Sequence, residues 1–223
     1  DATFKIVRRQ PVVVPSQVGS GIADDELAAQ VTTAIGNEPP NRTVTVSMGT
    51  RDPKLTTEQA QQLGITQKIS SFTQQFVYAP YRVQNIGEAA RRIDGTLLMP
   101  GETFSMNDTI KERTVANGYT VGFVIGGGGV FAEDLGGGVS AATTTMWTAA
   151  FFAGMERTFT QAHSIYISRY QAGLEATVAW GSFDMKFTND TPNAVFITTK
   201  MTNTSMNATF WGTPTYDEVK AEF

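Results

Sequence analysis

The stretch of sequence that decides the fold runs Leu135-Gly136-Gly137-Gly138-Val139-Ser140-Ala141-Ala142-Thr143-Thr144-Thr145. Its three glycines predict a tight turn, and the residues after them predict a helix over about 141–154. Glycine adopts positive φ and lets the backbone approach a ligand closely. The first turn of a helix offers unpaired N–H groups and the positive end of the helix dipole. We therefore expect Gly136, Gly137 and Gly138 to line a functional site.

Ser140 stands where the glycine turn meets the helix, and two roles are open to it. A serine in this place commonly caps the helix. A serine nucleophile would also be favoured here, because the helix start stabilises an anion. Gly137, Gly138 and the helix amides could then hold an oxyanion. The local sequence does not decide between the two roles.

His163 is the only histidine in the chain, so any histidine-dependent catalysis must use it. A serine nucleophile needs a general base, and that base needs an orienting partner. Ser140, His163 and Asp184 supply the required residue types. The alternative for His163 is a hydrogen-bonded structural side chain. Arg169, six residues later, could hold a carboxylate or pair on the surface.

The rest of the chain predicts short strands and a few helices without strict β-α-β alternation. Further helices are expected over 24–35, 56–64 and 82–93. Strands are expected over 4–6, 12–14, 43–48, 65–76, 158–161, 165–168, 176–179, 184–188, 194–201 and 206–210. Four glycines at 126–129 predict a hairpin or a flexible loop. The predicted class is therefore α+β, with a mixed, mainly antiparallel sheet and a glycine-rich loop leading into a central helix.

Composition excludes several kinds of function. The chain has 223 residues, of which 41% are hydrophobic and 17% charged, with a net charge of −4. It lacks the positive charge typical of nucleic-acid binders. It has no cysteine, which excludes disulfides, zinc–thiolate sites and a cysteine nucleophile. One histidine cannot form a multi-histidine metal site, so we expect no metal and no cofactor. The longest apolar stretch, 149–155, is shorter than the ~20 residues of a membrane helix.

Blocks in a fixed order along this chain resemble the VanW family. They are Ile69–Thr73, Asn85-Ile86, Ala89-Ala90, Pro100–Asn107, Arg113-Thr114, Asn117–Tyr119, Gly136–Val139 with its helix, Ala162–Ser164, Ala176–Val178 and Asp184–Phe187. Upstream, Leu55–Ala60 and Leu63–Ile65 resemble the end of a YoaR-like peptidoglycan-binding domain. The resemblance implies three parts: 1–64 as the C-terminal part of that domain, 65–212 as a VanW-like domain, and 213–223 as a tail.

The resemblance also implies a place in the cell and a partner. It implies an extracytoplasmic protein of a Gram-positive-type cell wall or cell surface, with peptidoglycan as its partner. Membrane attachment would use only a segment outside this chain, and the oligomeric state stays open. The family takes its name from glycopeptide-resistance gene clusters, and some members are linked to L,D-transpeptidation. The usual family motif is Gly-Gly-Gly-Val-Cys-Gln, where this chain has Ser140 and Ala141 in place of Cys and Gln.

Three functions follow, in this order of expectation. The first is binding of peptidoglycan stem peptides or glycan in a groove formed by Gly136, Gly137, Gly138, Ser164, Arg169 and Tyr119. The second is peptidoglycan acyl transfer by Ser140, with His163 as base and Asp184 orienting it. The third is an envelope scaffold without a ligand. A serine hydroxyl, unlike a thiol, needs a strong base, so the second function requires Ser140 and His163 to meet in space.

Overall fold

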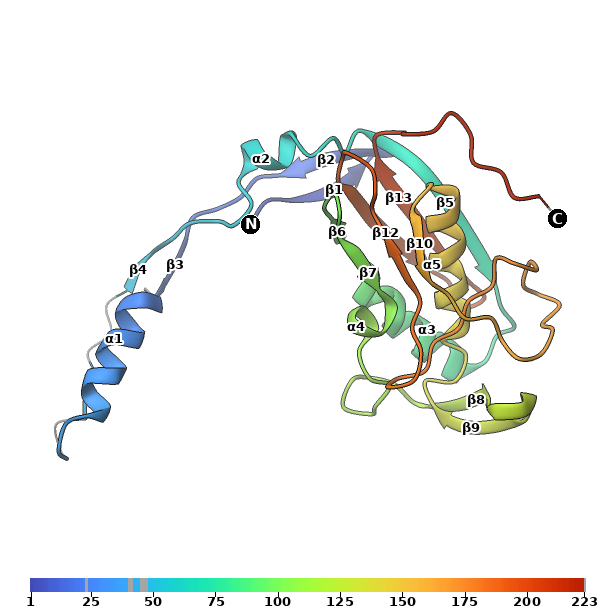
Figure 1. Cartoon of the computed structure of the whole chain (residues 1–223), viewed down its shortest axis with the longest axis horizontal. Helices are drawn as coiled ribbons and strands as arrows, with labels where there is room; N and C mark the ends of the chain where they lie inside the picture. The colour runs from blue at the N-terminus through green and yellow to red at the C-terminus, as the bar shows by residue number, and fades with distance from the viewer. Residues whose placement is uncertain (23, 40–41, 45–47, 223) are drawn as a thin grey trace. The chain divides into compact units, whose positions relative to one another are not determined.

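The computed structural model describes residues 1–22, 24–39, 42–44 and 48–222. It divides the chain into two compact units. The first contains residues 1–5 and 12–62, and the second contains residues 6–11 and the chain from Leu63 onward. Figure 1 shows the order of the elements within them. In the described part of the chain, every helix is too short or too polar to span a lipid bilayer.

Two small antiparallel pairs and two helices make up the N-terminal part of the chain. The elements are β1 (Thr3–Val7), β2 (Gln10–Val14), β3 (Gly19–Ile22), α1 (Asp24–Ile35), β4 (Met48–Arg51) and α2 (Thr57–Gln61). β1 pairs with β2, and β3 pairs with β4. The turn between β1 and β2 lies at Arg8-Arg9, which have φ of 49° and 64°.

Both N-terminal helices follow the sequence expectation. α1 covers the predicted range 24–35. α2 begins after a capping box in which the Thr56 hydroxyl accepts from the Gln59 N–H and the Gln59 side chain accepts from the Thr56 N–H. The strand expected over 43–48 falls largely on residues 45–47, which lie outside the described residues.

A four-stranded antiparallel sheet forms the framework of the second unit. Its order is β5 (Gln67–Gln75), β13 (Ser205–Gly212), β12 (Val195–Met201) and β6 (Thr96–Leu98). A three-stranded antiparallel sheet contains β10 (Glu156–Phe159), β11 (Lys186–Thr188) and β7 (Thr103–Ser105). These sheets confirm the predicted α+β class with antiparallel pairing.

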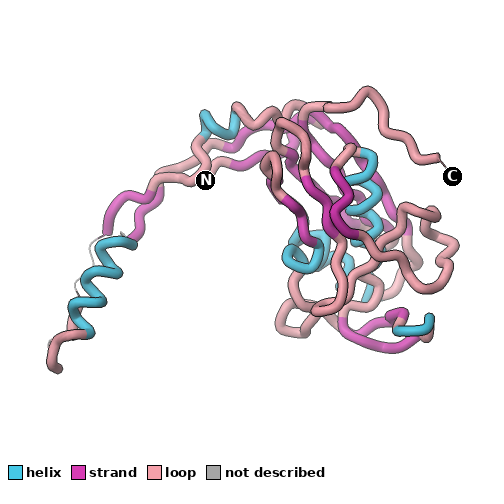
Figure 2. The backbone as a smooth tube through the Cα atoms, in the orientation of Figure 1, coloured by secondary structure: helices cyan, strands magenta, loops and turns pink. Residues whose placement is uncertain are grey.

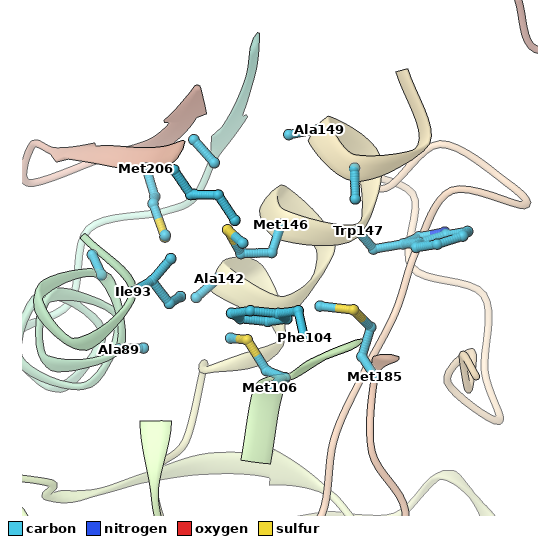
Figure 3. Packing of buried hydrophobic residues seen from close by; sticks show 14 of the residues in the cluster. Ala89, Ile93, Phe104, Met106, Ala142, Met146, Trp147, Ala149, Met185 and Met206 are labelled. Carbon is cyan, nitrogen blue, oxygen red and sulfur yellow. The ribbon is translucent and has the colours of Figure 1, made fainter. Parts of the chain in front are cut away.

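Three helices cover the framework: α3 (Pro80–Ile93), α4 (Met106–Ile110) and α5 (Ser140–Phe152). α5 is the central helix, and its residues 141–150 are all buried. It packs on β5 and β13, while α3 packs on β12. Figure 3 shows Met146 and Ala142 of α5 facing Ile93 of α3 and Met206 of β13. Small alanine and threonine side chains on α5 let these elements approach closely.

The segment between β10 and β11 departs from the predicted strands. Residues 160–185 form no helix and no strand, and Figure 2 draws them as loop. Only the isolated bridges Gln161↔Thr177 and Ala179↔Phe183 occur there. The strands predicted over 165–168 and 176–179 are therefore wrong. Part of the backbone there bonds to side chains of α5 instead of a neighbouring strand.

Candidate functional site

A cleft of about 990 Å³ opens at the start of α5. Its walls are the glycine turn before α5, the hairpin of β8 (Val121–Ile125) and β9 (Phe131–Leu135), and the loop segments 161–169 and 177–183. Gly126–Gly129 form the tip of that hairpin, with one 3-10 turn. A hairpin was one of the two structures predicted for these four glycines. All of these elements belong to the second unit.

The glycine turn packs too tightly for any other residue type. Gly136 and Gly138 have φ of 81° and 87°, a conformation that favours glycine. A Cβ on Gly137 would overlap the backbone of Gly122 in β8. The fully buried Asn85 of α3 holds the turn, since its Nδ2 donates to the carbonyl oxygens of Gly137 at 3.0 Å and Thr120 at 2.9 Å. The turn thus fixes where α5 begins.

Ser140 does not cap the helix. Val139 occupies the cap position, and no side chain caps the first turn. The Ser140 hydroxyl instead lies 3.1 Å from His163 Nε2 and 3.0 Å from Thr177 Oγ1. The N–H group of Ser140, which lines the cleft, makes no hydrogen bond to any described residue, whereas Ala142 is fully buried and lies outside the cleft lining. The Ser140 N–H lies in the first turn of α5, at the positive end of the helix dipole.

His163 is held on three sides. Its ring stacks on Tyr170 with centroids 5.8 Å apart, and its side chain is only 6% exposed. Glu175 accepts the backbone N–H of His163 at 3.1 Å, and its other carboxylate oxygen lies 3.6 Å from His163 Nδ1. Nδ1 is buried and has no hydrogen-bond partner among the described residues. A neutral ring with its proton on Nδ1 would face Glu175 and leave Nε2 to accept the Ser140 proton.

The pKa of His163 lies below its ordinary value of 6.5. Burial lowers the pKa and is the largest cause, while the Glu175 carboxylate raises it and Arg169 lowers it further. The imidazole is therefore neutral at pH 7. A neutral imidazole in contact with a serine hydroxyl can act as a general base.

Buried hydroxyls of α5 place Glu175. Thr144 and Thr148 lie four residues apart, on one face of the helix. The Thr144 hydroxyl donates to the Ala176 carbonyl at 3.1 Å and accepts the Ala176 N–H at 3.2 Å. The Thr148 hydroxyl donates to the Leu174 carbonyl at 3.0 Å. The backbone on both sides of Glu175 is thus tied to the same helix that carries Ser140.

Asp184 does not serve as the partner of His163. Its carboxylate accepts the Ser105 hydroxyl at 2.6 Å and the Asn107 N–H at 2.9 Å, where α4 begins. Glu175 occupies the place beside His163 Nδ1 that the sequence analysis gave to Asp184. The assignment of Asp184 is therefore corrected. The signal for Glu175 was present, because it and Asp184 are the only carboxylates between positions 163 and 184.

The expected binding residues divide into two groups. Four of them line the cleft: Gly136, Gly138, Ser164 and Arg169. Gly137 lies beneath the turn, against Gly122. Tyr119 is 2% exposed and belongs to the hydrophobic core, where its hydroxyl donates to the Ile110 carbonyl at 2.7 Å. Burial raises its pKa to about 12. Tyr119 therefore has no access to the cleft, which corrects its predicted role.

No group of three or more His, Asp or Glu residues that could hold a metal ion occurs among the described residues. The arrangement at the start of α5 is a serine hydroxyl, an imidazole and a carboxylate in a row. This arrangement is suited to acyl transfer.

The fold and the site together define a class of protein. It is an α+β domain in which a serine at the start of a central helix contacts a histidine. Residues 81–211, more than half of the chain, match the family described as VanW like protein. The chain belongs to the VanW family. This membership associates it with the cell envelope.

A curated relative supports the same assignment. The uncharacterized protein YoaR of Bacillus subtilis (strain 168) is 32% identical over 130 residues. These residues are 58% of this chain and 43% of the relative, so the chain spans less than half of that protein's length. No solved structure matches the chain.

Proposed function

We propose that the cleft binds peptidoglycan stem peptides and that Ser140 transfers their acyl groups. The observation that carries this proposal is the 3.1 Å contact between Ser140 Oγ and His163 Nε2, with Glu175 on the far side of the ring. The location proposed is the extracytoplasmic face of the envelope. Residues 1–64 are proposed as the end of a YoaR-like peptidoglycan-binding domain, 65–212 as the VanW-like domain and 213–223 as a tail.

In the proposed reaction, Ser140 Oγ attacks the carbonyl carbon of an amide bond in the donor peptide, while His163 Nε2 takes the hydroxyl proton. The Ser140 N–H, at the positive end of the helix dipole, holds the oxyanion. The C–N bond then breaks, and His163 gives the proton to the departing amine. An amine of a second stem peptide attacks the ester on Ser140, so one amide bond replaces another. Water in place of that amine would release the acyl group as an acid.

Binding without reaction is the second candidate. It is favoured by the 3.0 Å contact of the Ser140 hydroxyl with Thr177 Oγ1, because that contact gives the hydroxyl a structural partner. The same cleft residues, including Ser164 and Arg169, would then hold the peptide. The serine in place of the family cysteine also suits this candidate, since an alcohol is a weaker nucleophile than a thiolate.

Mass spectrometry separates the two candidates. Peptidoglycan fragments that contain tetrapeptide stems are incubated with the protein, and purified sacculi are sedimented with it in parallel. We expect a new cross-linked dimer or a released terminal residue, together with sedimentation. Sedimentation without a product would support binding alone. The absence of both product and sedimentation would contradict both candidates.

Replacing Glu175 with glutamine should lower kcat/KM by about 100-fold or more, because the ring loses the carboxylate that orients it. The variant should also shift the acid limb of the pH profile to lower pH, since the Glu175 carboxylate raises the pKa of His163. Asp184→Asn is the matched control. It weakens the hydrogen bonds at α4, lowers the free energy of unfolding by about 1–3 kcal/mol and leaves kcat/KM close to its original value. The reverse pattern would contradict the role of Glu175.

The reaction should lose rate only in acid. Because the pKa of His163 is lowered from 6.5, kcat/KM should be constant at neutral pH and fall as the pH drops below 6.5. The folded state binds fewer protons at His163 than the unfolded state, so the free energy of unfolding also decreases below that pH. Denaturant titrations at each pH separate this loss of stability from the loss of the base. An inflection of kcat/KM above pH 6.5 that belongs to His163 would contradict the assigned environment.

A further inference from the structure

Two arginine side chains lie against the glycine turn that leads to Ser140. A Cβ on Gly136 would overlap the side chain of Arg113, and a Cβ on Gly138 would come within 3.0 Å of Arg82 Cγ. Glycine at these two positions therefore makes room for one arginine each. Arg82 comes from α3 and Arg113 from the loop after α4. Both line the cleft.

Neither arginine forms an ion pair with any carboxylate in the described part of the chain. Arg82 donates to the Val77 carbonyl at 3.0 Å, and Arg113 donates to the Lys111 carbonyl at 2.9 Å. A guanidinium has five N–H donors, so most donors of both side chains are unused. The Arg113 guanidinium also lies over the Trp180 ring, 5.8 Å from its centroid.

The carboxylates nearby do not neutralise these charges. Glu112 and Asp134 line the cleft, and both are exposed to solvent. Glu112 and Asp184 act on Arg113 from beyond ion-pair distance and raise its pKa, but burial lowers it and is the largest cause. Arg113 is thus a partly desolvated cation without a paired anion. An anion entering the cleft would offset that cost of burial.

We propose that Arg82 and Arg113 form a carboxylate-binding subsite beside Ser140, so that the cleft selects peptides with a free carboxylate close to the amide bond that is exchanged. This inference rests on the proposed function and names the substrate feature that it requires. A guanidinium binds both oxygens of a carboxylate through parallel N–H donors. A primary amide offers one oxygen and an NH₂ group, which leaves guanidinium donors unpaired.

Arg169 is the third arginine of the cleft and has a different setting. Its guanidinium lies 4.7 Å from the centroid of the Tyr170 ring and donates to the Tyr170 hydroxyl at 3.3 Å. Tyr170 in turn stacks on His163. Arg169 therefore packs on the histidine side of the cleft, whereas Arg82 and Arg113 lie against the glycine turn. This difference makes Arg169→Gln an informative comparison.

The test uses the Ser140→Ala protein, which cannot consume the peptide, and isothermal titration calorimetry. The probes are two forms of one synthetic stem tetrapeptide, one ending in a free carboxylate and the other in a primary amide. We expect the acid to bind about tenfold or more tightly than the amide. Arg82→Gln and Arg113→Gln should each reduce that preference, and the double variant should abolish it. Equal affinities for the two peptides, or no binding of either, would overturn the inference.

Two controls keep the test decisive. Arg157→Gln changes an exposed arginine of β10 outside the cleft and should leave the preference unchanged. Added salt should weaken binding of the acid more than binding of the amide, and this measurement needs no change to the arginines if their variants misfold. A preference lost only in Arg169→Gln would overturn the assignment to the pair. A product without acid preference refutes this inference alone, whereas acid preference without a product refutes acyl transfer alone.

Discussion

Replacing Ser140 with alanine is expected to abolish acyl transfer, lowering kcat/KM by about 1000-fold or more. The substitution removes one oxygen atom, the one that lies 3.1 Å from His163 Nε2. Since Ser140 does not cap α5, the helix should form as before. Loss of the contact with Thr177 should cost about 1 kcal/mol of unfolding free energy. Product formation followed by mass spectrometry and thermal unfolding measure the two effects separately.

Two neighbouring variants show whether the hydroxyl reacts or only binds. Ser140→Cys keeps a nucleophile in contact with His163 and should therefore form product where Ser140→Ala forms none. Thr177→Val removes the other partner of the hydroxyl and keeps the Ser140–His163 contact, so most of the rate should remain. A Ser140→Ala protein as active as the original would refute the nucleophile. If the original protein and its variants form no product but still sediment with sacculi, the result would support binding alone.

The sequence predicted the turn and the helix of the site because both depend on local residue types. Three glycines followed by a run without glycine or proline can hardly form anything else, and α5 begins within one residue of the predicted start. The contact between Ser140 and His163 is of another kind, since the two residues are 23 positions apart. It depends on how the loop 160–185 packs against α5, which no local pattern encodes.

The choice between Glu175 and Asp184 shows where sequence reasoning stops. Both carboxylates follow His163, and spacing alone does not give their distance from it. Glu175 lies next to His163 because Thr144 and Thr148 form hydrogen bonds with the backbone on both sides of it. A buried threonine in an apolar helix looks like a packing residue until its hydroxyl partner is known. The prediction that Tyr119 lines the groove was wrong for a similar reason, because an aromatic ring can pack in a core as well as in a groove.

The sequence did not predict a role for the two arginines that pack on the glycine turn, because their positions depend on the missing Cβ atoms of Gly136 and Gly138. Arg82 and Arg113 are 31 positions apart in the sequence, and no short motif joins them. Gly136 leaves room for the side chain of Arg113, and Gly138 leaves room for that of Arg82. Glycines next to a proposed nucleophile thus have two effects, one on the backbone and one on the side chains packed against it.

Gly137→Ala is expected to be the most destabilising single change at the site, lowering the free energy of unfolding by about 3 kcal/mol or more. The added Cβ would overlap the backbone of Gly122 in β8, and backbone atoms cannot rotate out of the way as a side chain can. Asn85 makes retreat costly, because it bonds to both Gly137 and Thr120. Urea titration followed by circular dichroism measures the loss.

The matched control is Gly87→Ala in α3. Gly87 lies inside the helix, and nothing stands within 4 Å of the place where its Cβ would be. Alanine there should raise the free energy of unfolding by about 0.5–1 kcal/mol, because glycine is a poor helix former. The two changes have opposite signs because the added Cβ overlaps backbone atoms at Gly137, whereas at Gly87 it meets free space and improves the helix propensity. A Gly137→Ala protein as stable as the original would mean that β8 can move away from the turn. The position of Ser140 would then not depend on this contact.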